Sequence, residues 1–286
     1  MTHVRNIGLA ALLSFVAAGV GSVIWGALLI TNARTSLWVP WSVPVMAGVL
    51  VAYWLYLGGR GWPRSTSGKR RELLRARLVP AHIFAWAWAA GGLALVALAG
   101  LWIVLVELTG NGGNPTESLL AGYPTVIVVL AIAMGSLVSP LTEEASFRGY
   151  AQVLLERHYA PVIAVALSSV LFAVWHGPTQ GFFWSKLLFF FAVGVVFGTT
   201  AYLTRSVLPA IPVHIVGDLL FFILIWPQDA QRNVIAKHGP DVWFWVAIIQ
   251  LVVFATLSIL VFRRLAASRT AARLDATASA ASGGSH

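Results

Sequence analysis

A small set of ionisable side chains lies within or beside long apolar stretches of this sequence. The set comprises Glu143, Glu144, Arg148, His176, His214 and Asp218. Ionisable groups inside membrane-spanning segments are costly and usually face a cavity or a partner, so each is a candidate for a functional site. Carboxylates and imidazoles at one site are typical of general acid–base chemistry.

The spacing of these residues distinguishes two kinds of carboxylate. Glu144 and Arg148 are four residues apart, with Glu on the amino-terminal side, which favours an ion pair on a helix. Glu143 lies about 100° round the same helix and is less well placed for that arginine. A carboxylate without a nearby cation in an apolar pocket suits a general base, so Glu143 is the candidate base.

The histidines are weaker signals when they are taken singly. His176 at a helix end is typical of an interfacial histidine, and His214 within a helix is typical of a packing residue. Glu144 with Arg148 is compatible with a purely structural pair. Several costly residues without a common purpose would be unusual, which favours one site built by three helices.

The elements that position these residues are predicted to be transmembrane helices. The chain is 58% hydrophobic and 10% charged, against roughly 45–50% and about 25% in soluble domains. The sequence therefore predicts an all-α bundle over residues 1–264 with about eight membrane-spanning helices. Their expected ranges are about 7–30, 37–57, 82–108, 125–140, 161–175, 184–203, 208–226 and 242–262.

The fourth helix must extend beyond its apolar run. If it ended at Pro140, Glu143 would lie at one membrane edge and His176 near the other. Continuation to about Leu155 withdraws Glu143 by roughly 18 Å at about 1.5 Å per residue, and the two side chains can then meet. The Ala- and Ser-rich residues 265–286 are expected to form a disordered cytoplasmic tail.

The distribution of basic residues predicts the orientation of an integral protein of the cell membrane. With eight helices and both termini in the cytoplasm, 15 of the 19 Lys and Arg residues face the cytoplasm. This topology explains the net charge of +9 without nucleic acid. Interfacial anchoring is expected for the tryptophans near span ends, which are Trp38, Trp41, Trp54, Trp184, Trp226 and Trp243. Gly194 and Gly198 indicate close helix packing.

Three short motifs resemble those of the CAAX-protease and bacteriocin-processing family of intramembrane proteases, which includes type II prenyl endopeptidases and Abi-type proteins. The resemblance covers about residues 124–226. In order along the chain, the motifs read Glu143-Glu144-Ala145-Ser146-Phe147-Arg148, Phe172-Ala173-Val174-Trp175-His176 and His214-Ile215-Val216-Gly217-Asp218.

The resemblance implies that Glu143 and His176 activate a water molecule, while His214 and the residue at position 218 stabilise the oxyanion. It also implies that Glu144 holds Arg148. Many members carry Asn where this chain has Asp218, and an ionised Asp accepts hydrogen bonds only. Asp218 is therefore protonated, or orients His214, or helps bind a cation.

The cofactor requirement has two alternatives. Glu143, His176, His214 and Asp218 match a catalytic zinc ligand set by residue type. A glutamate-dependent mechanism without a metal is the other reading. The absence of cysteine excludes thiolate ligands, disulfides and a cysteine nucleophile.

The expected function is an intramembrane endopeptidase that cleaves a membrane-anchored or lipidated peptide, including prenylated CAAX-type substrates. Two alternatives are a non-catalytic immunity or scaffold protein of the same fold and a proton-coupled transporter, because carboxylate and histidine chains also relay protons. The expected partners are the peptide substrate and membrane lipids, and the oligomeric state is not readable from the sequence.

Overall fold

The computed structural model is an all-α bundle and describes residues 2–36, 38–113 and 122–282. No strand occurs among these residues. The α-helices are α1 (Thr2–Thr35), α2 (Ser42–Leu57), α3 (Ser67–Leu74), α4 (Ala81–Thr109), α6 (Thr125–Glu143), α7 (Gln152–Glu156), α8 (Pro161–Gln180), α9 (Trp184–Thr204), α10 (Ala210–Leu220), α11 (Ile235–His238) and α12 (Val242–Ser282).

Four shorter elements connect or extend these helices. Two are π-helical, η2 (Glu144–Ala151) and η3 (Phe221–Ile225), and two are 3₁₀-helical, η1 (Arg64–Thr66) and η4 (Trp226–Gln231). The π-helical elements prolong α6 and α10 without a break, because the residues at their junctions keep right-handed helical dihedral angles.

Seven helices in the described part of the chain are long and apolar enough to cross a membrane. The eighth expected span corresponds to α2, whose 16 residues fall short of the roughly 20 that cross a bilayer without thinning it. The chain is thus an integral membrane protein, and the expectation of about eight helices becomes seven long spans and one short apolar helix.

The fourth span extends beyond Pro140, as the depth argument required. One continuous helical span runs from Thr125 to Glu156. Pro140 lies inside α6, where it removes one backbone donor but does not end the helix. The hydroxyl of Thr142 donates to the Val138 carbonyl at 2.8 Å just beyond the proline.

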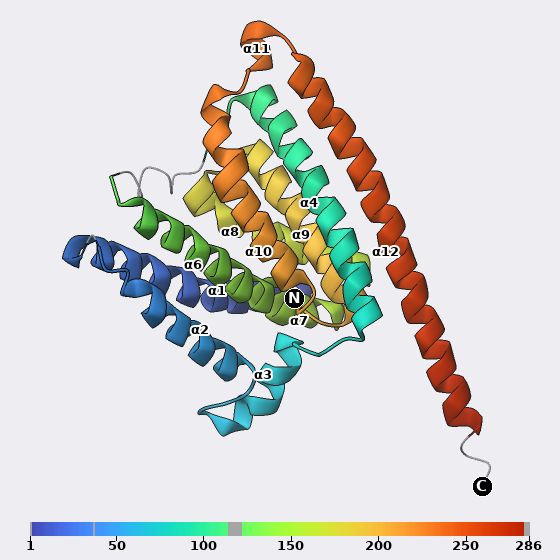
Figure 1. Cartoon of the computed structure of the whole chain (residues 1–286). Coiled ribbons are helices and arrows are strands. Elements are labelled where there is room, and N and C mark those ends of the chain that lie inside the picture. Colours follow the sequence, from blue (N-terminus) through green and yellow to red (C-terminus); the bar gives the residue numbers. More distant parts are fainter. Residues whose placement is uncertain (1, 37, 114–121, 283–286) are drawn as a thin grey trace.

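The helices form a bundle in which α10 lies between α6 and the α4, α9 pair, and α12 lies along the outside of α4 (Figure 1). An aromatic core fills the middle of the bundle. It is built mainly from Trp102, Phe147, Phe172, Phe189, Phe190, Phe221 and Trp226. This core borders the three helices that carry the ionisable residues.

The carboxyl-terminal helix differs from the expectation. Helix α12 continues to Ser282, so the disordered tail expected over 265–286 is wrong for residues 265–282. Residues 283–286 lie outside the described residues. Alanine and arginine in this stretch have high helix propensity, which favours continuation of the helix.

Candidate active site

The Glu-Glu-x-x-x-Arg motif begins at the junction between α6 and the π-helix η2. Glu143 is the last residue of α6, and Glu144 and Arg148 belong to η2. All eight residues of η2 are buried. A π-helix is rare and frequently occurs at functional sites, and here it carries Glu144 and Arg148 of the motif.

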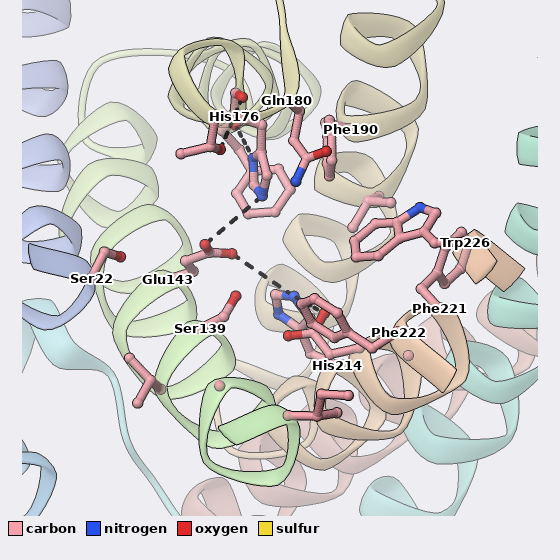
Figure 2. Close-up of a pocket in the computed structure, with 18 of the residues that line it drawn as sticks. Ser22, Ser139, Glu143, His176, Gln180, Phe190, His214, Phe221, Phe222 and Trp226 are labelled. Carbon is pink, nitrogen blue, oxygen red and sulfur yellow. Dashed lines mark hydrogen bonds and ion pairs between the residues drawn. The ribbon is translucent and has the colours of Figure 1, made fainter. Parts of the chain in front are cut away.

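Glu143 lies between the two histidines. Its Oε1 atom is 3.8 Å from His176 Nε2, and its Oε2 atom is 3.8 Å from His214 Nε2. Figure 2 shows the Glu143 carboxylate between these two rings, facing the cavity. Both distances are too long for a direct hydrogen bond but allow one water molecule to contact both groups. The structure therefore brings together the three residues expected to share a site.

The His176 ring is fixed by its own helix and by α9. Its Nδ1 atom lies 2.8 Å from the Phe172 carbonyl oxygen, which can only accept, so Nδ1 carries the proton and donates. The ring also stacks on Phe190, with centroids 3.8 Å apart and an interplanar angle of 14°. In the neutral ring, the Nε2 lone pair is therefore directed to the side where Glu143 lies.

Glu144 holds two buried partners. Its Oε1 atom is 3.3 Å from Arg148 Nη1, which confirms the predicted ion pair. The same oxygen is 2.9 Å from His214 Nδ1. Arg148 also lies over the Phe172 ring, 4.0 Å from its centroid. Glu144 thus orients His214 from η2, a contact that sequence spacing did not predict.

Asp218 lies one turn after His214, with its Oδ1 atom 3.5 Å from His214 Nε2. This distance is longer than the 2.9 Å contact between His214 Nδ1 and Glu144. Of these two carboxyl groups, Glu144 therefore makes the closer contact with His214. The Asp218 carboxyl group faces the cavity beside the Nε2 atom of His214.

The expected metal ligands can be compared with their arrangement in the structure. Within the described residues, no group of three or more His, Asp or Glu side chains is arranged to hold a metal ion. The donor types of the expected set match zinc. His214 turns Nδ1 to Glu144 and His176 turns Nδ1 to a carbonyl oxygen, so the Nε2 atoms of both rings face Glu143 and would be the atoms that hold a metal.

A cavity of about 380 Å³ adjoins the Glu143 carboxylate. Its wall combines aromatic rings from α9 and η3 with small residues of α1 and α6, including Gly26 and Gly135. Polar groups are few and gather near Glu143; they include Ser22, Ser139, His176, Thr179, His214 and Asp218. A mostly apolar hollow with a few convergent polar groups is typical of a site for a substrate with an apolar part.

Several site residues were not predicted from the sequence. Trp175 donates from Nε1 to Glu143 Oε1 at 3.3 Å, and Phe197 stacks on His214 with centroids 4.6 Å apart. Trp226, expected to anchor at the interface, is instead buried in the cavity wall among Trp102, Phe221 and Phe222. Its position near a span end resembled that of Trp184 and Trp243, which are exposed.

These features define a class: an integral membrane protein with a buried glutamate and two histidines on a cavity within its helical bundle. The model of the family described as "Type II CAAX prenyl endopeptidase Rce1-like" matches residues 125–220. No curated protein and no solved structure gives a match.

The matched residues contain all three motifs and the helices that carry them, from α6 to the end of α10. Over these residues the chain is similar to this family of CAAX prenyl endopeptidases, as the motifs predicted. At the level of the family, this supports a protease that acts on a membrane-associated peptide.

Proposed function

We propose that this protein is an intramembrane endopeptidase that hydrolyses a peptide bond of a membrane-anchored or lipidated substrate. The position of the Glu143 carboxylate, 3.8 Å from each of two imidazole Nε2 atoms on the cavity wall, carries the proposal. Prenylated CAAX-type peptides are the substrates that the family match favours.

Glu143 is the general base in this mechanism. Its Oε2 atom accepts no hydrogen bond from the described residues, whereas Oε1 accepts one from Trp175. A water molecule beside Glu143 and His176 would pass one proton to Glu143 while its oxygen bonds to the scissile carbonyl carbon. When the C–N bond breaks, Glu143 returns that proton to the leaving amine.

His214 is the proposed electrophilic partner. Glu144 fixes Nδ1 as a donor, and in the doubly protonated ring Nε2 also carries a proton that can reach the developing oxyanion. Asp218 lies beside the same nitrogen atom, so we propose that it acts as a protonated carboxyl group during the reaction. In that form it donates a hydrogen bond as the Asn of many family members would.

We also propose an orientation for the protein. Residues 58–80 carry seven basic residues and connect α2 to α4, and α3 and the carboxyl end of α12 lie toward the same end of the bundle (Figure 1). Basic loops favour the cytoplasmic side. Both termini would then be cytoplasmic, and the substrate would approach from that leaflet.

The test of the activity compares cleavage of matched peptides by purified protein in lipid nanodiscs. The panel contains prenylated and unprenylated forms of one CAAX-type sequence. We expect Glu143→Gln, His176→Ala and His214→Ala each to lower kcat/KM by about 10²–10⁴-fold, the range for loss of a general acid or base.

The matched control is Glu107→Gln. Glu107 is also a buried carboxyl group in a membrane helix, but it does not line the cavity. We expect this variant to cleave like the wild type, and all variants to keep a cooperative thermal unfolding transition. Wild-type cleavage by all three site variants would overturn the proposal, and proton flux dependent on Glu143 without cleavage would favour a transporter.

The metal-free form of this mechanism is tested separately. Because the expected ligands are not arranged as a metal-binding group, we expect full activity after dialysis against a chelator, with no zinc found by elemental analysis. Activity that is lost on chelation and restored by stoichiometric zinc would contradict the metal-free form. Glu143 and His176 would then act as metal ligands.

A further inference from the structure

A basic surface lies on the segment between α2 and α4, away from the cavity. Five of its side chains are exposed cations: Arg60, Arg64, Lys69, Arg71 and Arg77. None of them forms an ion pair with a carboxylate in the described part of the chain. The catalytic mechanism uses none of them.

The acidic groups near this segment already have other partners. Glu72, the only acidic residue of residues 58–80, pairs with Arg157 at 2.8 Å. Glu156 pairs with the buried Arg75 at 2.5 Å, and burial lowers the pKa of Arg75 while Glu156 opposes that shift. The five exposed cations therefore have no carboxylate partner, and together they produce a positive field that attracts anions.

The segment is ordered by another arginine. Arg70 is buried, and its guanidinium group donates to the carbonyl oxygens of Tyr56, Arg60, Gly61 and Pro63 and to the Thr66 hydroxyl. On the inner face of α3, Leu73 and Leu74 pack against Tyr150 and Leu154. The exposed cations are thus presented by a folded platform, and less conformational freedom is lost when they bind a partner.

Two large apolar side chains are exposed in the same segment. Trp62 is 85% exposed and Leu78 is 94% exposed. Both lie in the connection between the apolar helices α2 and α4, which places them near an end of each helix. Tryptophan prefers the headgroup level of a bilayer, and leucine prefers the acyl chains.

We propose that this surface, formed by Arg60, Trp62, Arg64, Lys69, Arg71, Arg77 and Leu78, binds the headgroups of anionic phospholipids in the adjoining leaflet. The cations contact the phosphates while Trp62 and Leu78 enter the headgroup and acyl boundary. Clustered Lys and Arg immediately beside a membrane helix attract anionic lipid, and apolar anchors add to that attraction.

The experiment measures lipid bound to purified protein by native mass spectrometry after titration with phosphatidylglycerol or phosphatidylcholine. We expect the wild type to retain phosphatidylglycerol in preference to phosphatidylcholine, and Arg64→Gln/Lys69→Gln to bind phosphatidylglycerol about thirtyfold more weakly. Arg64→Lys/Lys69→Arg keeps both charges and should bind like the wild type.

The matched control removes two exposed cations elsewhere, Arg34→Gln/Lys237→Gln. It should leave phosphatidylglycerol binding unchanged. Equal retention of the two lipids by the wild type would overturn the proposal. So would a loss of phosphatidylglycerol binding in Arg34→Gln/Lys237→Gln as large as the loss in Arg64→Gln/Lys69→Gln. The binding readout is independent of peptide cleavage, so this result stands or falls separately from the proposed protease activity.

Discussion

Glu144 is the residue on which the buried polar network depends, because one carboxylate oxygen serves both Arg148 and His214. The side chains of Glu144 and Arg148 are 0% and 1% exposed. Removal of one partner from a buried pair leaves the other charge without compensation, and this costs about 3–5 kcal/mol. The pair therefore constrains stability as well as the orientation of His214.

We expect Arg148→Met to lower the free energy of unfolding by about 3–5 kcal/mol. Arg157→Met is the matched control, because it breaks the pair of Arg157 with Glu72, whose side chains are 38% and 57% exposed. Exposed pairs contribute about 0–1 kcal/mol. Denaturant unfolding in mixed micelles measures both variants, and equal losses would contradict the assigned role of Arg148.

Residue types and spacing predicted that Glu143, His176 and His214 lie together, because costly ionisable residues on three separate membrane helices are best explained by one shared site. They did not predict that Trp175 donates to Glu143 or that Phe190 stacks on His176. Aromatic residues abound in any membrane helix, so no sequence signal separates a ring that positions a histidine from one that faces lipid. Only the tertiary arrangement makes that distinction.

At the scale of elements, α8 and α9 approach closely through glycine. A Cβ atom added to Gly194 would lie 2.7 Å from Ser169 Cβ and 2.8 Å from Ser169 Cα. This confirms the close helix packing predicted from Gly194 and Gly198. Because α8 carries His176 and α9 carries Phe190, the contact also sets the distance between the ring and its stacking partner.

We expect Gly194→Ala to destabilise the protein by about 1–3 kcal/mol, as overpacking of a tight contact does. Gly92→Ala is the control, since a Cβ atom there meets nothing within 4 Å. In a helix interior that change favours folding by roughly 0.5–1 kcal/mol. Thermal unfolding of the two variants should therefore shift in opposite directions, and a stabilised Gly194→Ala would refute the packing argument.

Most helices could be predicted from the apolar runs, and the passage of the fourth through Pro140 followed from the need for Glu143 to reach His176. The π-helical segments could not be predicted, because hydrophobic periodicity has no signature for a local change in hydrogen-bond pattern. The end of α12 was also missed. Its polar alanine-rich part lacks the apolar signal of a membrane helix but retains high helix propensity.

The whole molecule has an orientation that labelling can test, because the chain contains no cysteine. We predict that a maleimide added outside intact cells modifies Lys237→Cys and spares Arg64→Cys. Inverted membrane vesicles should give the opposite result. Among the described residues, five membrane spans, which begin with α4 and end with α10, separate Arg64 from Lys237, so the two residues lie on opposite sides whether or not α2 crosses the membrane. Labelling of both variants from one side would contradict an odd number of membrane crossings between the two residues.

The π-helix η2 also fixes the length of the chain between two anchored points. Before this π-helix, Glu143 must face the two histidines. After it, Glu156 forms an ion pair with Arg75, and the Nη1 atom of Arg75 donates to the Ala201 carbonyl. Deletion of one residue between them would rotate one anchor by about 100° and draw it in by about 1.5 Å relative to the other. Among homologues that keep both anchors, this stretch should therefore vary by substitution and carry no gaps.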